Sequence, residues 1–168
     1  GATNNNYTEF DKLDKHRVCG IKLFMGSSTG NMLVDKMNSL LNIFNGTDML
    51  IAAHCEDQET IKNNIEKYKQ KYKGADDIPV SAHPSIRSVP ACYASSELAV
   101  RLAKIAGARL HILHVSTAKE LQLFSDEPLA NKNITAEACV AHLLFTLTHY
   151  NSLGARIKCN PAVKRKTD

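Results

Sequence analysis

Residues 19–30 read CGIKLFMGSSTG, a short apolar strand followed at once by a loop of small residues. The strand carries a lysine, Lys22, between Ile21 and Leu23. A charged ammonium is costly to bury unless it is paired or gives up its proton. Two interpretations of Lys22 therefore stay open. Its head reaches water or a carboxylate, or its amine is directed at a metal site, where a carbamate formed with carbon dioxide would bridge two cations.

The composition is that of an ordinary globular protein, with 43% hydrophobic and 23% charged residues. The net charge of +4 is spread along the chain, and the basic tail at 164–166 contains no aromatic residue, which gives a nucleic-acid surface no support. No apolar run reaches the ~18 residues of a membrane span, and no secretory leader is recognisable. Five scattered cysteines without a CxxC pair favour free thiols in a reducing compartment. We therefore expect a cytoplasmic protein with no nucleic-acid or membrane partner.

Apolar periodicity predicts strands that alternate with helices along the whole chain. The expected strands are 18–24, 49–53, 80–83, 109–115, 134–136 and 155–159, and the expected helices are 31–44, 57–74, 91–106, 117–124 and 137–150. Asp57 and either Ser116 or Thr117 are predicted caps, Gly74 and Gly107 are predicted terminators, and Leu98, Leu102 and Ile105 are expected to face inward. This alternation implies parallel strands with helical crossovers, in an open doubly wound sheet or in part of a β/α barrel.

Polar residues lie near the ends of four predicted strands: Lys22, His54, His114 and Asn160. Because parallel strands bring their carboxyl ends to one rim, we expect these side chains to form a constellation there. A single histidine in such a place is more often a hydrogen-bonded core residue than a ligand. Two histidines together with a strand lysine favour a zinc site, since neutral imidazole suits zinc and a carboxylate-like bridge suits a two-metal centre.

The remaining histidines are weaker candidates. His111 and His114 are three residues apart on one strand, so the pleat predicts opposite faces for them. His114, at the carboxyl end, is the candidate ligand, and we interpret His111 as a structural or outward residue. His83 is a possible loop contact, and His16, His142 and His149 are expected to be structural. The loop at 26–30 could hold a phosphate, although it lacks the lysine of a P-loop.

Five segments together carry a specific pattern: GIKLFMGSSTGNMLVD at 20–35, AAHCED at 52–57, HILHVSTAKEL at 111–121, ITAEAC at 134–139 and KCNPAVK at 158–164. They resemble the dihydroorotases of the cyclic amidohydrolase group, with dihydropyrimidinases and allantoinases as close relatives. The resemblance covers nearly the whole chain. It implies an α/β fold that is part of a TIM-type (β/α)8 barrel of the metal-dependent hydrolase superfamily, about strands four to seven with their helices.

The resemblance also implies the site and its cofactor. Lys22 would be carboxylated and would bridge two Zn2+ ions per complete active site, and His54 and His114 would bind the second, more exposed zinc. Asn160 matches the residue that hydrogen-bonds the substrate ring. The implied reaction is reversible hydrolysis of a small molecule, dihydroorotate, to N-carbamoyl-aspartate in pyrimidine biosynthesis. A homo-oligomer is expected.

The sequence also departs from the family pattern. The His-x-His pair that holds the first metal, and the arginine just past it that binds the substrate carboxylate, are absent, and the general-base aspartate is expected beyond the C-terminus. We therefore expect no catalytic residue within the chain. Residues 1–168 are expected to be an incomplete central segment of the barrel, inactive alone and unstable or associating. The alternatives are a hydantoinase, dihydropyrimidinase or allantoinase and, from another class, a non-catalytic amidohydrolase-like assembly protein.

Overall fold

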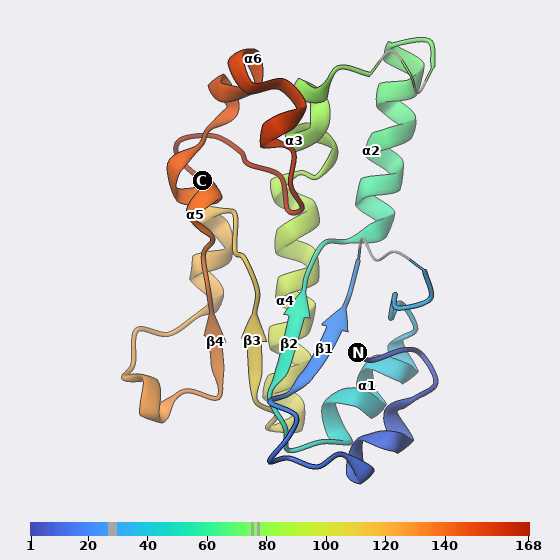
Figure 1. The fold of residues 1–168 in the computed structure, drawn as a ribbon, viewed down its shortest axis with the longest axis vertical. Helices are drawn as coiled ribbons and strands as arrows, with labels where there is room; N and C mark the ends of the chain where they lie inside the picture. Colours follow the sequence, from blue (N-terminus) through green and yellow to red (C-terminus); the bar gives the residue numbers. More distant parts are fainter. Residues whose placement is uncertain (27–29, 75, 77) are drawn as a thin grey trace.

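The computed structural model describes residues 1–26, 30–74, 76 and 78–168 of the chain. Within these ranges, four parallel strands form one sheet in the order β1-β2-β3-β4 (Figure 1). Their bounds are Ile21–Phe24 for β1, Ile51–His54 for β2, Leu110–Ile112 for β3 and Ile134–Ala136 for β4. Each strand pairs with the next one along the chain. This is the order of a β/α barrel, whereas a doubly wound sheet reverses its strand order at a switch point.

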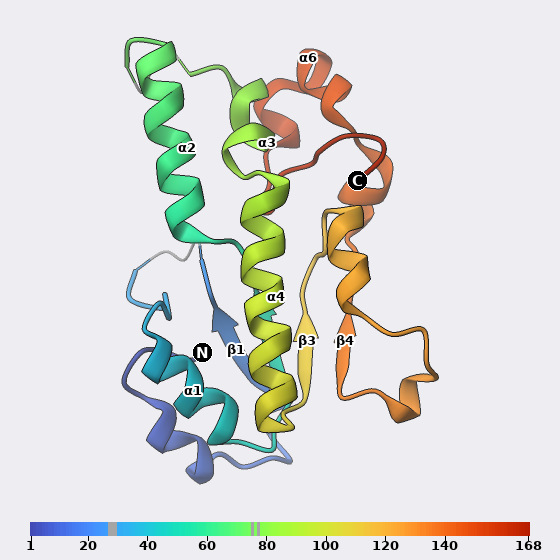
Figure 2. The same cartoon turned by 180° about the vertical axis from the view of Figure 1, so that it is seen from behind.

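Three longer helices connect the first three strands. Helix α1 spans Met37–Asn45, α2 spans Gln58–Lys71 and α4 spans Val89–Ala106. Seen from behind, α4 lies along the sheet and α1 lies near the amino ends of the strands (Figure 2). The short helices are α3 His83–Ile86, α5 Val140–Leu144 and α6 Tyr150–Leu153. The 3-10 turns are η1 Tyr7–Lys12, η2 Val80–Ala82, η3 Ala118–Leu123, η4 Leu129–Asn131, η5 Leu147–His149 and η6 Gly154–Ile157.

The core lies between one face of the sheet and helices α1 and α4. Alternate strand residues supply its sheet side, namely Ile21, Leu23, Ile51, Ala53, Leu110 and Ile112. The opposite face holds Lys22, Ala52 and His111, which lie side by side in register and are only half-buried. In the described part of the chain this face is open (Figure 1). Polar groups on it are therefore accessible at the carboxyl ends of the strands.

The predicted caps agree with the structure. The Asp57 side chain accepts a hydrogen bond from the Thr60 N–H (2.8 Å) where α2 begins. The Thr117 hydroxyl accepts one from the Glu120 N–H (3.2 Å) where η3 begins. Helix α4 ends at Gly107 with φ 65°, a left-handed conformation that glycine adopts without steric cost. These three local signals were sufficient to place helix ends.

Two predicted strands are wrong. Residues 80–83 form η2 and the start of α3, and the segment 155–159 contains the end of η6 instead of a strand. The apolar side chains of the last segment do not extend the sheet beyond β4. Ile157 and Val163 instead pack with Tyr150 in a small cluster separate from the main core. Asn160 consequently lies in a loop.

Helix α1 begins later than periodicity predicts. Leu33 forms a parallel bridge with Phe24, and the Val34 N–H donates to the Phe24 carbonyl (2.9 Å), so this segment runs beside β1 before the helix begins at Met37. Helix α2 also ends earlier than expected. Its C-cap is Tyr72, so the predicted terminator Gly74 lies two residues further on.

The single helix predicted for 137–150 is divided into α5, η5 and α6. The division has a non-local cause. The Leu147 N–H donates to the Lys164 carbonyl (2.7 Å), and Thr146 begins a new turn in a capping box with His149. A backbone group bonded to a distant segment is not available to continue a helix.

Ile105 is exposed, contrary to the expectation that it faces inward; 71% of its surface is accessible. The buried face of α4 is formed largely by small side chains, namely Cys92, Ser96, Ala99 and Ala103. Small residues let the helix approach the sheet closely along this face, and Ile105 lies outside it. Leu102 is buried and Leu98 is partly buried, as expected.

No helix in the described ranges has the length and hydrophobicity that a membrane span requires. The five cysteines are free; Cys55 and Cys92 are buried, and Cys19 and Cys139 are exposed. Residues 27–29 of the small-residue loop lie outside the described residues. The phosphate-loop interpretation of 26–30 therefore remains a sequence hypothesis.

Gly26, directly after β1, permits a close approach of two backbone segments. A Cβ at this position would lie 1.8 Å from the Glu56 carbonyl oxygen. We expect Gly26→Ala to lower the free energy of unfolding by about 3 kcal/mol, at the upper end of overpacking costs, because backbone must move. At Gly107 a Cβ meets nothing within 4 Å, so Gly107→Ala should cost only its backbone strain, about 1 kcal/mol. Urea titration compares the two variants, and equal costs would contradict the prediction.

Candidate functional site

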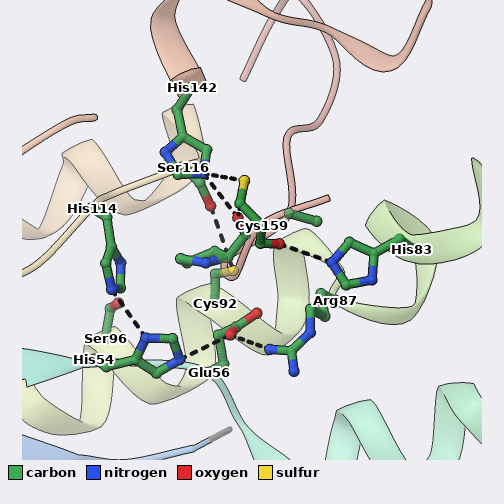
Figure 3. Close-up of polar contacts among 12 residues, drawn as sticks. His54, Glu56, His83, Arg87, Cys92, Ser96, His114, Ser116, His142 and Cys159 are labelled. Carbon is green, nitrogen blue, oxygen red and sulfur yellow. Dashed lines mark hydrogen bonds and ion pairs between the residues drawn. The ribbon is translucent and has the colours of Figure 1, made fainter. Parts of the chain in front are cut away.

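The structure brings His54 and His114 together, although 60 residues separate them in the sequence. His54 is the last residue of β2, and His114 lies two residues past the end of β3. The His54 Nδ1 atom is 3.0 Å from the His114 Nε2 atom, and the rings meet edge to face (Figure 3). His54 is buried and His114 is half-buried. Two imidazole nitrogens are thus directed at each other where parallel strands end.

An unusual backbone conformation directs His114 toward His54. Its φ is 41°, in the left-handed region that non-glycine residues seldom adopt. The neighbouring backbone is fixed from two sides: the Leu113 N–H donates to the Ala53 carbonyl (3.0 Å), and the Val115 N–H donates to the Glu137 carbonyl (2.7 Å). Strained conformations of this kind persist where the surrounding structure holds them, often at functional sites.

The structure also places His111 differently from the sequence prediction, because the left-handed turn at His114 ends the regular alternation of the strand. The pleat rule predicts opposite faces for His111 and His114 only while both belong to a regular strand. His111 is in register with Lys22 on the open face, so of the two predicted alternatives the outward one is wrong and the structural one agrees with its hydrogen bonds. Its Nδ1 atom is 2.8 Å from the Thr135 hydroxyl of β4, and its Nε2 atom is 3.4 Å from Glu137. His111 joins two strands at the edge of the candidate site.

Lys22 lies on the same open face as His54. Its Nζ atom is 4.3 Å from the centre of the Phe24 ring, and Phe24 pairs in register with His54. Burial lowers the pKa of Lys22, against smaller opposing effects of Cys55 and Glu137. None of the ion pairs found among the described residues involves Lys22. A cation–π contact replaces the carboxylate partner that one interpretation of the sequence expected.

Sequence reasoning assigned no role to Glu56 and Arg87. Glu56 is fully buried, and its Oε2 atom is 2.9 Å from the His54 Nε2 atom. The Arg87 guanidinium donates to the same oxygen (Figure 3). The available signal was the glutamate two residues past His54 in AAHCED, just beyond a predicted apolar strand. Arg87 had no comparable signal, since it lies 31 residues further along the chain.

Asn160 is exposed in a loop whose flanks are held by two histidines. His83 bonds through Nε2 to the Cys159 carbonyl (2.8 Å), and His142 bonds through Nε2 to the Pro161 carbonyl (2.9 Å). Figure 3 shows the contact of His83 with Cys159. His83 is thus the loop contact expected of it, and His142 has a structural role. No contact between Asn160 and Lys22, His54 or His114 is found in the described part of the chain.

The histidine pair fits a zinc ion. Two nitrogens bound to tetrahedral zinc at 2.0–2.1 Å lie about 3.3 Å apart, close to the observed 3.0 Å. The His114 Nδ1 atom is buried and has no partner among the described residues. His, Cys, Asp and Glu alone form no metal-binding group of three or more within the described ranges. A carbamate on Lys22 would add oxygen donors from the adjacent strand.

Burial, and then the charges of His54 and Lys22, lower the pKa of His114 to about 4. Because the unfolded chain binds a proton near pH 6.5 and the folded chain does not, stability should fall as the pH decreases from about 6.5 to about 4. We expect His114→Asn to flatten this dependence in metal-free protein. Urea unfolding at pH 7 and pH 5 measures it. The pKa of His83 is lowered in the same direction, so only the difference between wild type and variant is diagnostic, and equal pH slopes would contradict the prediction.

No family model matches the chain. Curated proteins do match it over almost its whole length. It is 27% identical to a dihydroorotase of Methanosphaera stadtmanae over 97% of the chain and 26% identical to a dihydroorotase of Bacillus caldolyticus over 100%. An allantoinase of Escherichia coli is 25% identical over 98%. The chain spans 39%, 37% and 37% of these three proteins.

Solved structures show the same fold. An L-hydantoinase (dihydropyrimidinase) from Arthrobacter aurescens superposes with a TM-score of 0.85 at 23% identity, covering 98% of this chain and 36% of that protein. A D-hydantoinase superposes with a TM-score of 0.83 at 22% identity, covering 99% and 36%. The fold is therefore part of the TIM-type barrel of these enzymes, as the sequence predicted. In sequence this chain is thus similar to dihydroorotases and to an allantoinase, and in fold it is similar to hydantoinases.

Proposed function

We propose that the protein is a zinc-dependent cyclic amidohydrolase that reversibly hydrolyses dihydroorotate to N-carbamoyl-aspartate. The observation that carries the proposal is the paired His54 Nδ1 and His114 Nε2 atoms, 3.0 Å apart at the carboxyl ends of two parallel strands. Similarity to two dihydroorotases supports the substrate. In this proposal residues 1–168 are the central segment of the barrel, and the remaining ligands and the general base come from outside them.

Each residue of the candidate site then has a defined role. His54 and His114 hold one zinc ion, and a carboxylated Lys22 bridges it to a second. Burial supports this role of Lys22, since a lowered pKa leaves more of its amine neutral and able to add to carbon dioxide. Asn160 hydrogen-bonds the substrate ring. When bound, the zinc ions polarise the ring carbonyl and activate the attacking water.

The alternative substrates are hydantoins or dihydropyrimidines, which the structural similarity to the L-hydantoinase (dihydropyrimidinase) favours, and allantoin, which the similarity to an allantoinase favours. The chemistry is the same for all of them, because each is a cyclic amide opened at a ring carbonyl. The difference lies in the groups that contact the ring substituents. In the dihydroorotase proposal an arginine outside these residues binds the substrate carboxylate.

A substrate panel tests the proposal. The full polypeptide that contains this segment is incubated with dihydroorotate, hydantoin, dihydrouracil and allantoin, and products are separated by chromatography. We expect the highest kcat/KM for dihydroorotate and no turnover by residues 1–168 alone. A higher kcat/KM for hydantoin, dihydrouracil or allantoin would instead assign the alternative function that corresponds to that substrate. Absence of both zinc and turnover in the full polypeptide would instead favour the non-catalytic assembly role.

The same proposal includes a cytoplasmic protein that acts as a homo-oligomer. Free cysteines, two of them buried, are compatible with a reducing compartment. Large apolar side chains on and around α5 are exposed, including Val140, Leu143 and Leu144. Such surfaces are typical of contacts with further protein.

A further inference from the structure

Glu56 contacts His54 from inside the protein. It follows β2 by two residues, and its side chain is fully buried. Its Oε2 atom lies 2.9 Å from the His54 Nε2 atom, on the side of the ring away from His114 (Figure 3). The Arg87 guanidinium donates to the same oxygen, so the Glu56 carboxylate is paired with a cation and accepts hydrogen bonds from both sides.

An ionised carboxylate can only accept hydrogen bonds, so the proton of His54 must be on Nε2. The His54 Nδ1 atom then carries a free lone pair, and this is the atom directed at His114. The contact with Glu56 on one side of the ring consequently determines the tautomer of His54 and which nitrogen faces His114 on the other side. Ligating histidines commonly donate their second N–H to a carboxylate, and loss of such a partner costs 10–100-fold in metal affinity.

Arg87 holds the carboxylate from the other side. Its guanidinium donates to the oxygen that His54 contacts, and its side chain is only 15% exposed. The turn that carries it is itself anchored. The Arg87 N–H donates to the His83 carbonyl (2.9 Å), and the Asn64 side chain of α2 donates to the Ile86 carbonyl (3.0 Å). Glu56 thus lies between a fixed guanidinium and the imidazole.

We propose that Glu56, held by Arg87, is a positioning residue that fixes the tautomer and orientation of His54 so that Nδ1 is presented to a divalent metal ion shared with His114. This inference rests on the proposed function and adds to it a residue outside the ligand set. Glu56 touches neither substrate nor metal in this arrangement and acts only through His54. Its effect should therefore appear in the imidazole before any metal is added.

The first test reads the tautomer of His54 directly. Metal is removed with a chelator, and 15N NMR of histidine-labelled chain reports which ring nitrogen carries the proton. In wild type we expect a single form protonated on Nε2. In Glu56→Ala we expect a mixture of both tautomers, and in Glu56→Gln, which retains an acceptor oxygen, an intermediate result. An unchanged single tautomer in Glu56→Ala would overturn the inference.

The second test measures zinc affinity by competition with a coloured chelator. We expect Glu56→Ala to bind zinc about 10–100-fold more weakly, with part of the affinity restored in Glu56→Gln. Glu120→Gln is the matched control, because Glu120 is also a buried carboxylate but bonds to the Ser96 and Thr117 hydroxyls (2.6 and 2.8 Å) instead of a histidine. Glu120→Gln should leave zinc affinity unchanged. An equal loss of zinc affinity in Glu56→Ala and Glu120→Gln would show a general structural effect and overturn the positioning role of Glu56.

The two readouts separate this inference from the proposed function. If wild type has the fixed tautomer but binds no zinc, the metal-dependent function fails, and so does the presentation of Nδ1 to a metal. If wild type binds zinc and Glu56→Ala alters neither tautomer nor affinity, the zinc site stands and the role of Glu56 is refuted.

Discussion

Lys22→Ala is expected to abolish tight binding of the proposed metal pair and, with it, the proposed hydrolysis of a cyclic amide. The physical reason is the loss of the only group proposed to contact both ions. The lysine nitrogen attacks carbon dioxide, releases a proton and becomes a carbamate with two anionic oxygens. Burial favours this step because it lowers the pKa of Lys22 and so leaves more free amine. Loss of an outer partner costs 10–100-fold in metal affinity, so loss of a bridging ligand should cost more than ~100-fold.

Zinc content and turnover of the full polypeptide measure this effect. Lys119→Ala is a close control, because the Lys119 ammonium also lies over an aromatic ring, 4.2 Å from the centre of Tyr93, as Lys22 lies 4.3 Å from that of Phe24. The control variant should keep its metal and activity. Retention of the metal pair by Lys22→Ala would remove Lys22 from the ligand set.

Arg87→Met is expected to lower the free energy of unfolding by about 3–5 kcal/mol, the usual cost of removing one partner from a buried ion pair. Glu56 has no solvent exposure, and its Oε1 atom has no partner among the described residues. Without the guanidinium, its negative charge would keep the hydrogen bond from His54 and the weaker effect of the Lys164 charge. Removal of the Arg87 charge alone should therefore destabilise the fold more than removal of the Arg87 and Glu56 charges together.

Urea unfolding of single and double variants tests this prediction. In Glu56→Gln/Arg87→Met neither charge of this pair remains, so we expect the double variant to be more stable than Arg87→Met alone. Arg101→Met controls for the loss of any arginine, since Arg101 is exposed on α4, and it should change stability by less than about 0.5 kcal/mol. Equal stability of Arg87→Met and Arg101→Met would show that the pair contributes little.

Local patterns in the sequence were enough to predict most of the sheet. All four strands were expected near their observed positions, and the caps at Asp57, Thr117 and Gly107 were recognised from short-range chemistry. Predictions failed where a distant segment decides the conformation. The backbone bond from Leu147 to Lys164 interrupts a helix that periodicity alone would continue, and the packing of Ile157 on Tyr150 replaces an expected strand.

The sequence by itself determined that strands and helices alternate and that Lys22, His54 and His114 occur near strand ends, since hydrophobic periodicity depends only on neighbouring residues. The tertiary structure decided how those side chains meet. The left-handed turn at His114 exists because backbone bonds from other strands hold it, and it brings an imidazole to His54 that the pleat would have placed elsewhere. The pairing of Glu56 with Arg87 likewise joins residues 31 positions apart. Contacts of this kind arise from packing, so no local pattern contains them.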